Sequence, residues 1–261
     1  MIGLKLYNNE ICNIMILHSM IWFIIGAVIG SFLNVVADRL LRGEQFVKGH
    51  SYCEHCKTIL KPKDLIPIIS FMSTGGKCRY CGVKLSKQYP ISELVTAIGT
   101  VILYLKLHSD IYEFLIALTL LYTMIVASIM DYKETWVADR VHLAGIVMLL
   151  ILRVLQWEKL FFAMQGMVVS VLFLGLIYVI SQGKMGGADI KIYAPIGLAV
   201  GMNRGIESLF YASAISLPIL VFYIIIKKKP LKGVEIPFIP FIGLGVFATY
   251  FYDYIGQNFI I

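Results

Sequence analysis

The sequence is poor in charge, and poorest in acidic residues. Only 15% of its 261 residues are charged, with 16 Asp and Glu against 23 Lys and Arg, whereas 59% are hydrophobic. Soluble domains carry about 25% charged residues and are about half apolar. The mean hydropathy of +0.80 therefore excludes an ordinary soluble domain, whose single core could not hide this much apolar surface. The composition predicts an all-α, polytopic membrane protein.

The chain also has no evident internal repeat and no low-complexity linker. A bilayer requires about 20 apolar residues for each crossing. This requirement predicts about eight transmembrane helices, at 17–37, 91–107, 113–130, 140–156, 160–181, 190–203, 206–226 and 236–255. The fourth and sixth of these spans are interrupted or short. The first span is too long for a cleaved signal peptide and leads to no small-residue cleavage site, so we expect it to remain in the membrane.

Basic residues are distributed unevenly among the predicted connections. Loops 38–90, 131–140, 182–191 and 227–235 hold 18 of the 23 Lys and Arg. Because cytoplasmic loops are enriched in basic residues, these four loops are predicted to be cytoplasmic and both termini to face outward. Topology thus accounts for the net charge of +7, and nucleic-acid binding is not needed to explain it.

Polar residues, turn residues and four of the five cysteines gather in one segment, 38–90. The predicted organisation is an outward N-terminus with the first transmembrane helix (1–37), a cytoplasmic module (38–90) that contains short hairpins, and a transmembrane bundle (91–261). The lysines and arginines of the module could contact anionic lipid headgroups or an acidic ligand, although the topological charge bias explains them equally well.

The cytoplasmic module contains two CxxC pairs, Cys53 with Cys56 and Cys78 with Cys81, separated by 21 residues. Two such pairs complete a tetrahedral set of four thiolates, which Zn²⁺ prefers, although the spacer slightly exceeds the usual 15–20 residues. The alternatives are two disulfides or redox-active dithiols, which a cytoplasmic location disfavours. The pattern predicts a structural zinc site, whose metal would supply most of the module's folding free energy, on the order of 10 kcal/mol.

Two carboxylates adjoin predicted spans on the cytoplasmic side. Asp131 follows the third span, and Asp189 lies in the sequence MGGADIK. Ionisable residues at such positions are functional candidates because they are costly near a membrane. Two adjacent carboxylates cannot both ionise easily, so one can activate a water while the other protonates a leaving nitrogen. The glycines before Asp189 permit close approach of a substrate backbone and unusual backbone dihedrals.

Each aspartate also has a structural interpretation. Asp131 could simply end its span at the water boundary beside Lys133. Asp189 could cap the helix that follows it, where exposed N–H groups favour a carboxylate. Asp139 lies on the same loop as Asp131 and is expected to cap the span that begins near residue 140.

Several motifs together resemble a known family. In order along the chain they are GSFLNVVADRL, the double CxxC, IPIISF, GGKCRYCG, YPISELVT, the Asp131 loop, MGGADIK and EIPFIPFIGLG. Their order and spacing, over about residues 30–245, resemble those of the prepilin peptidases, which are intramembrane aspartic proteases of the GxGD class.

The resemblance implies that Asp131 and Asp189 are the catalytic pair of a multi-pass enzyme of the bacterial cytoplasmic membrane. Such enzymes cleave the leader of type IV prepilins or pseudopilins at the cytoplasmic face. Many members that have the cysteine module also methylate the new N-terminus with S-adenosylmethionine. The resemblance places this second activity near Gly76 and Lys77, and implies zinc on the four cysteines.

Two departures from the family pattern concern the aspartates. Ala188 stands where the family has the second glycine of GxGD, and Ala138 stands where the family has proline before Asp139. Further residues are expected to support the site, with helix packing, hydrogen bonding between helices or interfacial positioning as the alternatives. They are Gly186, Gly187, Lys191, Glu93 and Asn34. Gly26 and Gly30 form a GxxxG pattern that predicts close helix packing.

Two other functions remain open. The chain could be a peptidase without methyltransferase activity. It could instead be a transporter that uses the two aspartates, with the zinc module as a regulatory loop. Transporters commonly contain internal repeats, which this chain lacks.

Overall fold

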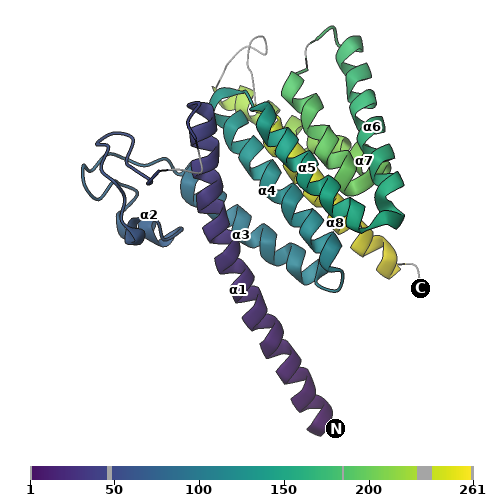
Figure 1. Ribbon diagram of the computed structural model, residues 1–261, viewed down its shortest axis with the longest axis horizontal. Helices are drawn as coiled ribbons and strands as arrows, with labels where there is room; N and C mark the ends of the chain where they lie inside the picture. The colour runs from purple at the N-terminus through teal and green to yellow at the C-terminus, as the bar shows by residue number, and fades with distance from the viewer. Residues whose placement is uncertain (1, 46–48, 184, 228–236, 260–261) are drawn as a thin grey trace. The chain divides into compact units, whose positions relative to one another are not determined.

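The computed structural model describes the backbone of residues 2–45, 49–183, 185–227 and 237–259, and the side chains of these residues apart from 2–12, 224, 227 and 250–259. The described residues are almost entirely helical, as the composition predicts (Figure 1). The chain divides into two compact units, Met1–Phe114 and Leu115–Ile261, which are described separately below.

The helices follow the predicted apolar spans. Five of those in the described residues are long and apolar enough to cross a membrane: Asn13–Leu41 of α1 (Ile2–Leu41), α3 (Gln88–Leu107), α4 (Ile111–Glu134), α6 (Trp157–Ile180) and Gly187–Tyr223 of α7 (Gly187–Lys227). Helix α5 (Asp139–Leu155) and α8 (Ile239–Phe259) coincide with the remaining two spans. The prediction of a polytopic helical membrane protein is confirmed.

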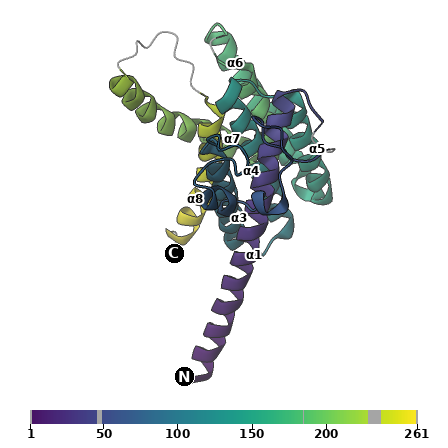
Figure 2. The same ribbon diagram turned by 90° about the vertical axis from the view of Figure 1, so that its left-hand side faces the viewer.

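In the first unit, α1 and α3 pack side by side, with their backbones in close contact (Figures 1 and 2). A Cβ atom at Gly26 would lie 2.8 Å from Cα of Ala97, and one at Gly30 would lie 3.0 Å from Cα of Glu93. Larger residues would therefore separate the helices. The close packing predicted from the GxxxG pattern is confirmed, and α3 is its partner.

Helix α7 in the second unit is a hairpin of two helical halves. Gly201 has φ 80° and ψ −180°, a conformation that glycine adopts far more readily than other residues. The hydroxyl oxygens of Tyr193 and Ser208 are 3.4 Å apart, whereas residues 15 positions apart in a straight helix would be separated by roughly 22 Å. The predicted spans 190–203 and 206–226 are therefore the two arms of this hairpin, and Gly187 and Lys227 lie toward the same end.

A buried arginine stabilises the turn of the α7 hairpin. Arg153 of α5 is 6% exposed, and its guanidinium donates to the backbone carbonyls of Leu198, at 3.3 Å, and Ala199. Carbonyls at the end of a helix lack the partner that the next turn would supply. Arg153 supplies donors for two of them just before the break at Gly201.

The segment between α1 and α3 contains little regular structure. It holds a 3₁₀ turn, η1 (Pro62–Asp64), the short helix α2 (Ile69–Ser73), and two isolated antiparallel bridges, Tyr52–Ile59 and Lys77–Lys84. Each bridge closes a tight turn around one CxxC pair. Hairpins were predicted in this module, and these two bridges are the only β pairing in the described residues.

Candidate active site and metal centre

Asp131 lies in the last turn of α4 and is only 6% exposed. Its Oδ2 atom accepts a hydrogen bond of 3.0 Å from the backbone N–H of Ile239, the first residue of α8. The first N–H groups of a helix have no partner within the helix. Asp131 therefore does more than end its span at the water boundary, because its carboxylate binds the start of another helix.

Asp189 is the third residue of α7, and its side chain is half-buried. Its backbone N–H donates to the carbonyl of Gly186 at 3.1 Å, and its Oδ2 lies close enough to Gly186 that a Cβ there would be 3.0 Å away. Asp189 therefore lies in the first turn of α7, where exposed N–H groups favour a carboxylate.

Both carboxylates line one pocket of about 890 Å³ in the second unit. Its walls come from the end of α4 with the connection to α5 (131–139), from Gly183, Met185 and Gly186 before α7, from the first residues of α7, and from Phe238. The charge of Asp131 acts on Asp189 across the pocket. The predicted pair therefore meets in one cavity, where two carboxylates can exchange protons with a bound water.

The glycines beside Asp189 provide space rather than unusual dihedrals. Positive φ occurs at neither Gly186 nor Gly187, so the expectation of unusual dihedrals is wrong. A Cβ at Gly186 would lie 3.0 Å from Oδ2 of Asp189, whereas one at Gly187 would meet nothing within 4 Å. Ala188 lies within the helix without a positive φ, so its methyl group causes no backbone strain where the family has glycine.

Lys191 interacts with Asp139. Its Nζ lies 2.7 Å from Asp139 Oδ1, and both side chains are largely exposed at the pocket wall. This ion pair lowers the pKa of Asp139 below its usual value. Asp139 does not cap α5 as expected, because Ala138 occupies the cap position and no side chain caps the helix there.

Sequence patterns did not identify the backbone N–H of Ile239 or the walls at Trp136 and Phe238 as parts of the site. The signal that was available is the motif EIPFIPFIGLG, whose start supplies both Phe238 and Ile239. A backbone donor is present at almost every residue, so its partner becomes visible only once the helices are packed.

In the first unit, the four cysteine sulfurs form a compact cluster. All four lie within 4.8 Å of one another, and Cys53 Sγ is 3.9 Å from Cys81 Sγ. Bonds of about 2.3 Å in a tetrahedral zinc site place the sulfurs about 3.8 Å apart. The donor set and its spacing fit a metal ion of this kind.

The two turns that carry the cysteines have the same hydrogen bonds. Cys53 N–H donates to Thr58 at 3.0 Å, and Cys78 N–H donates to Val83 at 2.8 Å. The left-handed position of each turn is Lys57, φ 58°, in the first and Gly82, φ 72°, in the second.

One thiol of the cluster is already disposed to bind a metal. Hydrogen bonds with Thr58 lower the pKa of Cys56 to about 6. This direction favours the thiolate, which is the form that binds a metal.

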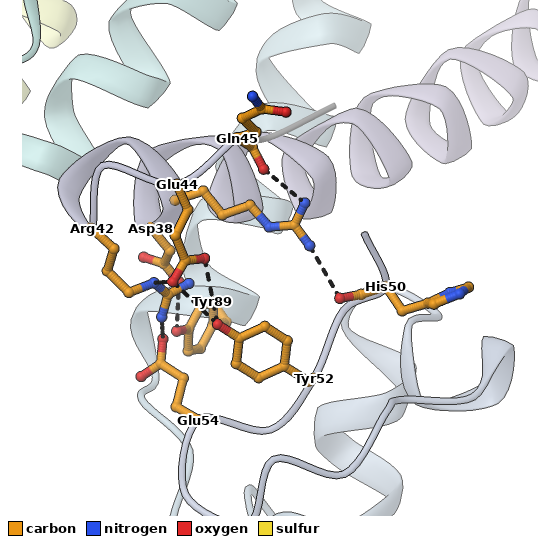
Figure 3. Close-up of polar contacts among 9 residues, drawn as sticks. Asp38, Arg42, Glu44, Gln45, His50, Tyr52, Glu54 and Tyr89 are labelled. Atoms are coloured by element: carbon orange, nitrogen blue, oxygen red, sulfur yellow. Dashed lines mark hydrogen bonds and ion pairs between the residues drawn. The ribbon is translucent and has the colours of Figure 1, made fainter. Parts of the chain in front are cut away.

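Polar contacts attach the first turn to the end of α1 (Figure 3). Arg42 binds Glu54 at 2.5 Å and Glu44 at 3.3 Å, and the Tyr52 hydroxyl donates to Glu44. Asp38 of α1 also accepts a 2.9 Å hydrogen bond from the Tyr89 hydroxyl of α3. The first cysteine turn is therefore attached to the end of α1, which is itself hydrogen-bonded to α3.

The other predicted support residues in the first unit make contacts within that unit. Asn34 Oδ1 accepts a 2.8 Å hydrogen bond from Ser92, which is the interhelical alternative considered for it. Buried Glu93 accepts a 2.7 Å hydrogen bond from the N–H of Ile68. Gly76, φ 72°, and Lys77 connect α2 to the second cysteine turn.

Two family profiles cover most of the chain. Residues 24–107 match the bacterial peptidase A24 N-terminal domain, and residues 118–221 match the type IV leader peptidase family. The chain belongs to the type IV leader peptidase family. No solved structure matches it with significance.

Curated relatives of this leader peptidase family resemble the chain over most of their length. A prepilin leader peptidase/N-methyltransferase of Bacillus subtilis is 28% identical, over 89% of this chain and 93% of the relative. A type 4 prepilin-like proteins leader peptide-processing enzyme of Escherichia coli is 29% identical over 86% and 90%. A prepilin leader peptidase/N-methyltransferase of Vibrio cholerae is 27% identical over 76% and 83%.

Proposed function

We propose that the chain is an intramembrane aspartic endopeptidase that cleaves the leader peptides of type IV prepilins or pseudopilins. The observation that carries this proposal is the single pocket that holds both Asp131 and Asp189. Family membership and the names of the relatives support the substrate class.

In the proposed reaction, a water molecule lies between the two carboxylates. One carboxylate accepts a proton from the water as the water oxygen attacks the scissile carbonyl carbon. The other, initially protonated, donates its proton to the nitrogen as the C–N bond breaks. The Ile239 N–H group orients the Asp131 carboxylate, and the first turn of α7 carries the Asp189 carboxylate. Neither a nucleophilic side chain nor a metal takes part in this scheme.

A second step, N-methylation of the new amino terminus, is proposed for the same chain. S-adenosylmethionine would supply the methyl group, and the names of the Bacillus subtilis and Vibrio cholerae relatives support this activity. We assign the methyl-donor site to the neighbourhood of Gly76 and Lys77. Cys53, Cys56, Cys78 and Cys81 would hold a structural Zn²⁺ that fixes the fold of this module.

The proposed location is the bacterial cytoplasmic membrane, with the pocket open to the cytoplasm. The bias of Lys and Arg toward the loops at residues 131–140 and 182–191 supports this orientation, because these loops form walls of the pocket.

The test is incubation of the purified, reconstituted protein with a prepilin and S-adenosylmethionine, followed by mass spectrometry of the pilin. Loss of the leader reports cleavage, and the added mass of one methyl group on the mature N-terminus reports methylation. Asp131→Asn and Asp189→Asn should each abolish cleavage, while Asp139→Asn, which removes a carboxylate from the same pocket wall, should retain it.

Cleavage by either the Asp131 or the Asp189 variant would reject the dyad. Cleavage without methylation would reduce the function to that of a peptidase alone. Solute flux into liposomes without any cleavage would instead favour a transporter.

A further inference from the structure

The segment that leads into α2 exposes large apolar side chains. Residues 65–72 read LIPIISFM, in which Ser70 is the only polar residue. Ile66 is 45% exposed, Ile69 63% and Met72 73%. A concentrated group of exposed apolar side chains on a small, polar module usually marks a surface of interaction.

A hydrogen bond to a membrane helix fixes the depth of this segment. The Ile68 N–H donates to Glu93 Oε2 at 2.7 Å, and Glu93 is only 7% exposed. Helix α3 has 20 residues, which corresponds to about 30 Å, the thickness of the hydrocarbon core. Glu93 is five residues inside α3, roughly 7 Å from its start. The backbone at Ile68 therefore lies beside the second turn of a membrane span.

The backbone of the segment is held in a costly conformation at this point. Ile68 has φ 63° and ψ −51°, and a positive φ is a genuine outlier for a β-branched residue. The hydrogen bond to Glu93 and the turn into α2 maintain it. The sharp change in direction brings Ile69 and Met72 to the surface immediately after the point of attachment to α3.

Basic residues border the apolar segment. Lys61 and Lys63 precede it, Lys77 follows it, and all three side chains are exposed. Anionic headgroups at the cytoplasmic surface attract such residues. Apolar side chains at the depth of the interface, with lysines on both sides, are typical of elements that lie in the plane of the membrane surface.

We propose that residues 65–72 insert into the headgroup region of the bilayer. Ile66, Ile69 and Met72 would then contact lipid, and the cysteine module would rest on the membrane surface. The partner is the anionic leaflet rather than a protein, because the bond to Glu93 places the segment alongside a membrane span and lysines border it on both sides. The inference is independent of the proposed peptidase and methyltransferase activities.

The test uses the full chain with a photoreactive benzophenone amino acid at a single position. Positions 69 and 72 probe the segment. Position 59 is the matched control, because Ile59 is a similarly exposed apolar residue, at 57%, on the first cysteine turn. Each protein is reconstituted in vesicles of phosphatidylethanolamine and phosphatidylglycerol, irradiated, and examined by mass spectrometry for lipid adducts.

We expect lipid adducts from positions 69 and 72 at about five times or more the yield from position 59, because interfacial side chains reach the acyl chains. Equal yields at all three positions would overturn the proposal. Adducts to a second copy of the chain in place of lipid, or to a prepilin added to the vesicles, would overturn it as well and identify a protein partner for this surface.

Discussion

The backbone N–H of Ile239 donates a 3.0 Å hydrogen bond to Oδ2 of Asp131, across 108 positions of sequence. One of the two pocket carboxylates is thus oriented by the first residue of the last helix. Replacing Ile239 with proline removes this donor while keeping a residue that is favoured at the first position of a helix.

We expect Ile239→Pro to lower kcat for prepilin cleavage by about 10- to 100-fold with little change in KM. A hydrogen bond to a charged group contributes about 1.5–3 kcal/mol, and each 1.4 kcal/mol corresponds to a factor of ten in rate. Ile239→Val, which keeps the N–H, should retain nearly full activity. Normal kcat in a folded Ile239→Pro protein would mean that the bond does not position Asp131.

The two glycines before Asp189 make a matched pair of substitutions. Gly186→Ala places a methyl group 3.0 Å from Asp189 Oδ2 and should displace the carboxylate, whereas Gly187→Ala meets nothing within 4 Å. We expect kcat/KM to fall about tenfold or more for Gly186→Ala, since small misplacements of catalytic groups are costly. Gly187→Ala should have little effect, and thermal unfolding should be similar for both. Equal activity of the two variants would contradict the proposed crowding.

Loss of the metal should separate the two proposed activities. We expect one zinc ion per chain by elemental analysis, and its loss in Cys78→Ser or after chelation. The module would then lose a folding contribution on the order of 10 kcal/mol, and methylation with it. Cleavage should persist, because both aspartates belong to the other compact unit.

Cys12→Ser is the control for the metal experiment, since Cys12 lies outside the double CxxC pattern. Unchanged zinc content in Cys78→Ser would disprove the four-cysteine site.

The Lys191–Asp139 pair predicts a specific dependence of stability on pH. The folded-state pKa of Asp139 is lowered, so the pair's contribution is fully present above the unfolded pKa of about 3.9 and is lost as the pH falls through the lower folded value. The Tm difference between the wild-type protein and Asp139→Asn should therefore be small and constant from pH 8 to 5, as expected for an exposed pair. It should decrease only below about pH 4 and vanish once the pH is below the lowered folded-state pKa of Asp139.

Lys191→Gln should show the same pH dependence, and combining both substitutions should add nothing further. A large Tm loss that persists at low pH would indicate another role for Asp139.

Arg153 should be important for the stability of the α7 hairpin. Arg153→Gln removes the charged donors from the carbonyls of Leu198 and Ala199, and should destabilise the protein by about 2–3 kcal/mol. Arg153→Lys should give an intermediate loss, because a single ammonium cannot reproduce the guanidinium fork. Arg140→Gln, an exposed position on the same helix, is the control in thermal unfolding experiments. Equal Tm values for the Arg140 and Arg153 variants would show that the hairpin does not depend on this contact.

Features encoded within short stretches of sequence could be predicted. The cysteine cluster follows from two CxxC pairs, because the spacing within each pair already directs both sulfurs to one point. The helices follow from apolar run length, and the two arms of α7 were predicted as separate spans, although the break at Gly201 lies inside the predicted span 190–203. Close packing of the face with Gly26 and Gly30 was predicted from the GxxxG pattern, but that α3 is its partner came only from the structure.

Interactions between distant residues could not be predicted in the same way. Lys191 was expected only to support the site, and its partner is Asp139, 52 positions away in the sequence. Whether the methyl group of Ala188 strains the backbone depends on whether residue 188 is helical. The structure settles this, because α7 begins at Gly187 and includes Ala188.

The amino-acid sequence by itself determined the membrane character, the metal-binding pattern and the two candidate carboxylates, because run length, spacing and residue type are local properties. Tertiary structure decided that these carboxylates share a pocket, that the first N–H of α8 binds one of them, and that Glu93 holds the segment before α2. Hydrogen bonds of this kind depend on how helices far apart in the chain pack together, and no residue pattern records that packing.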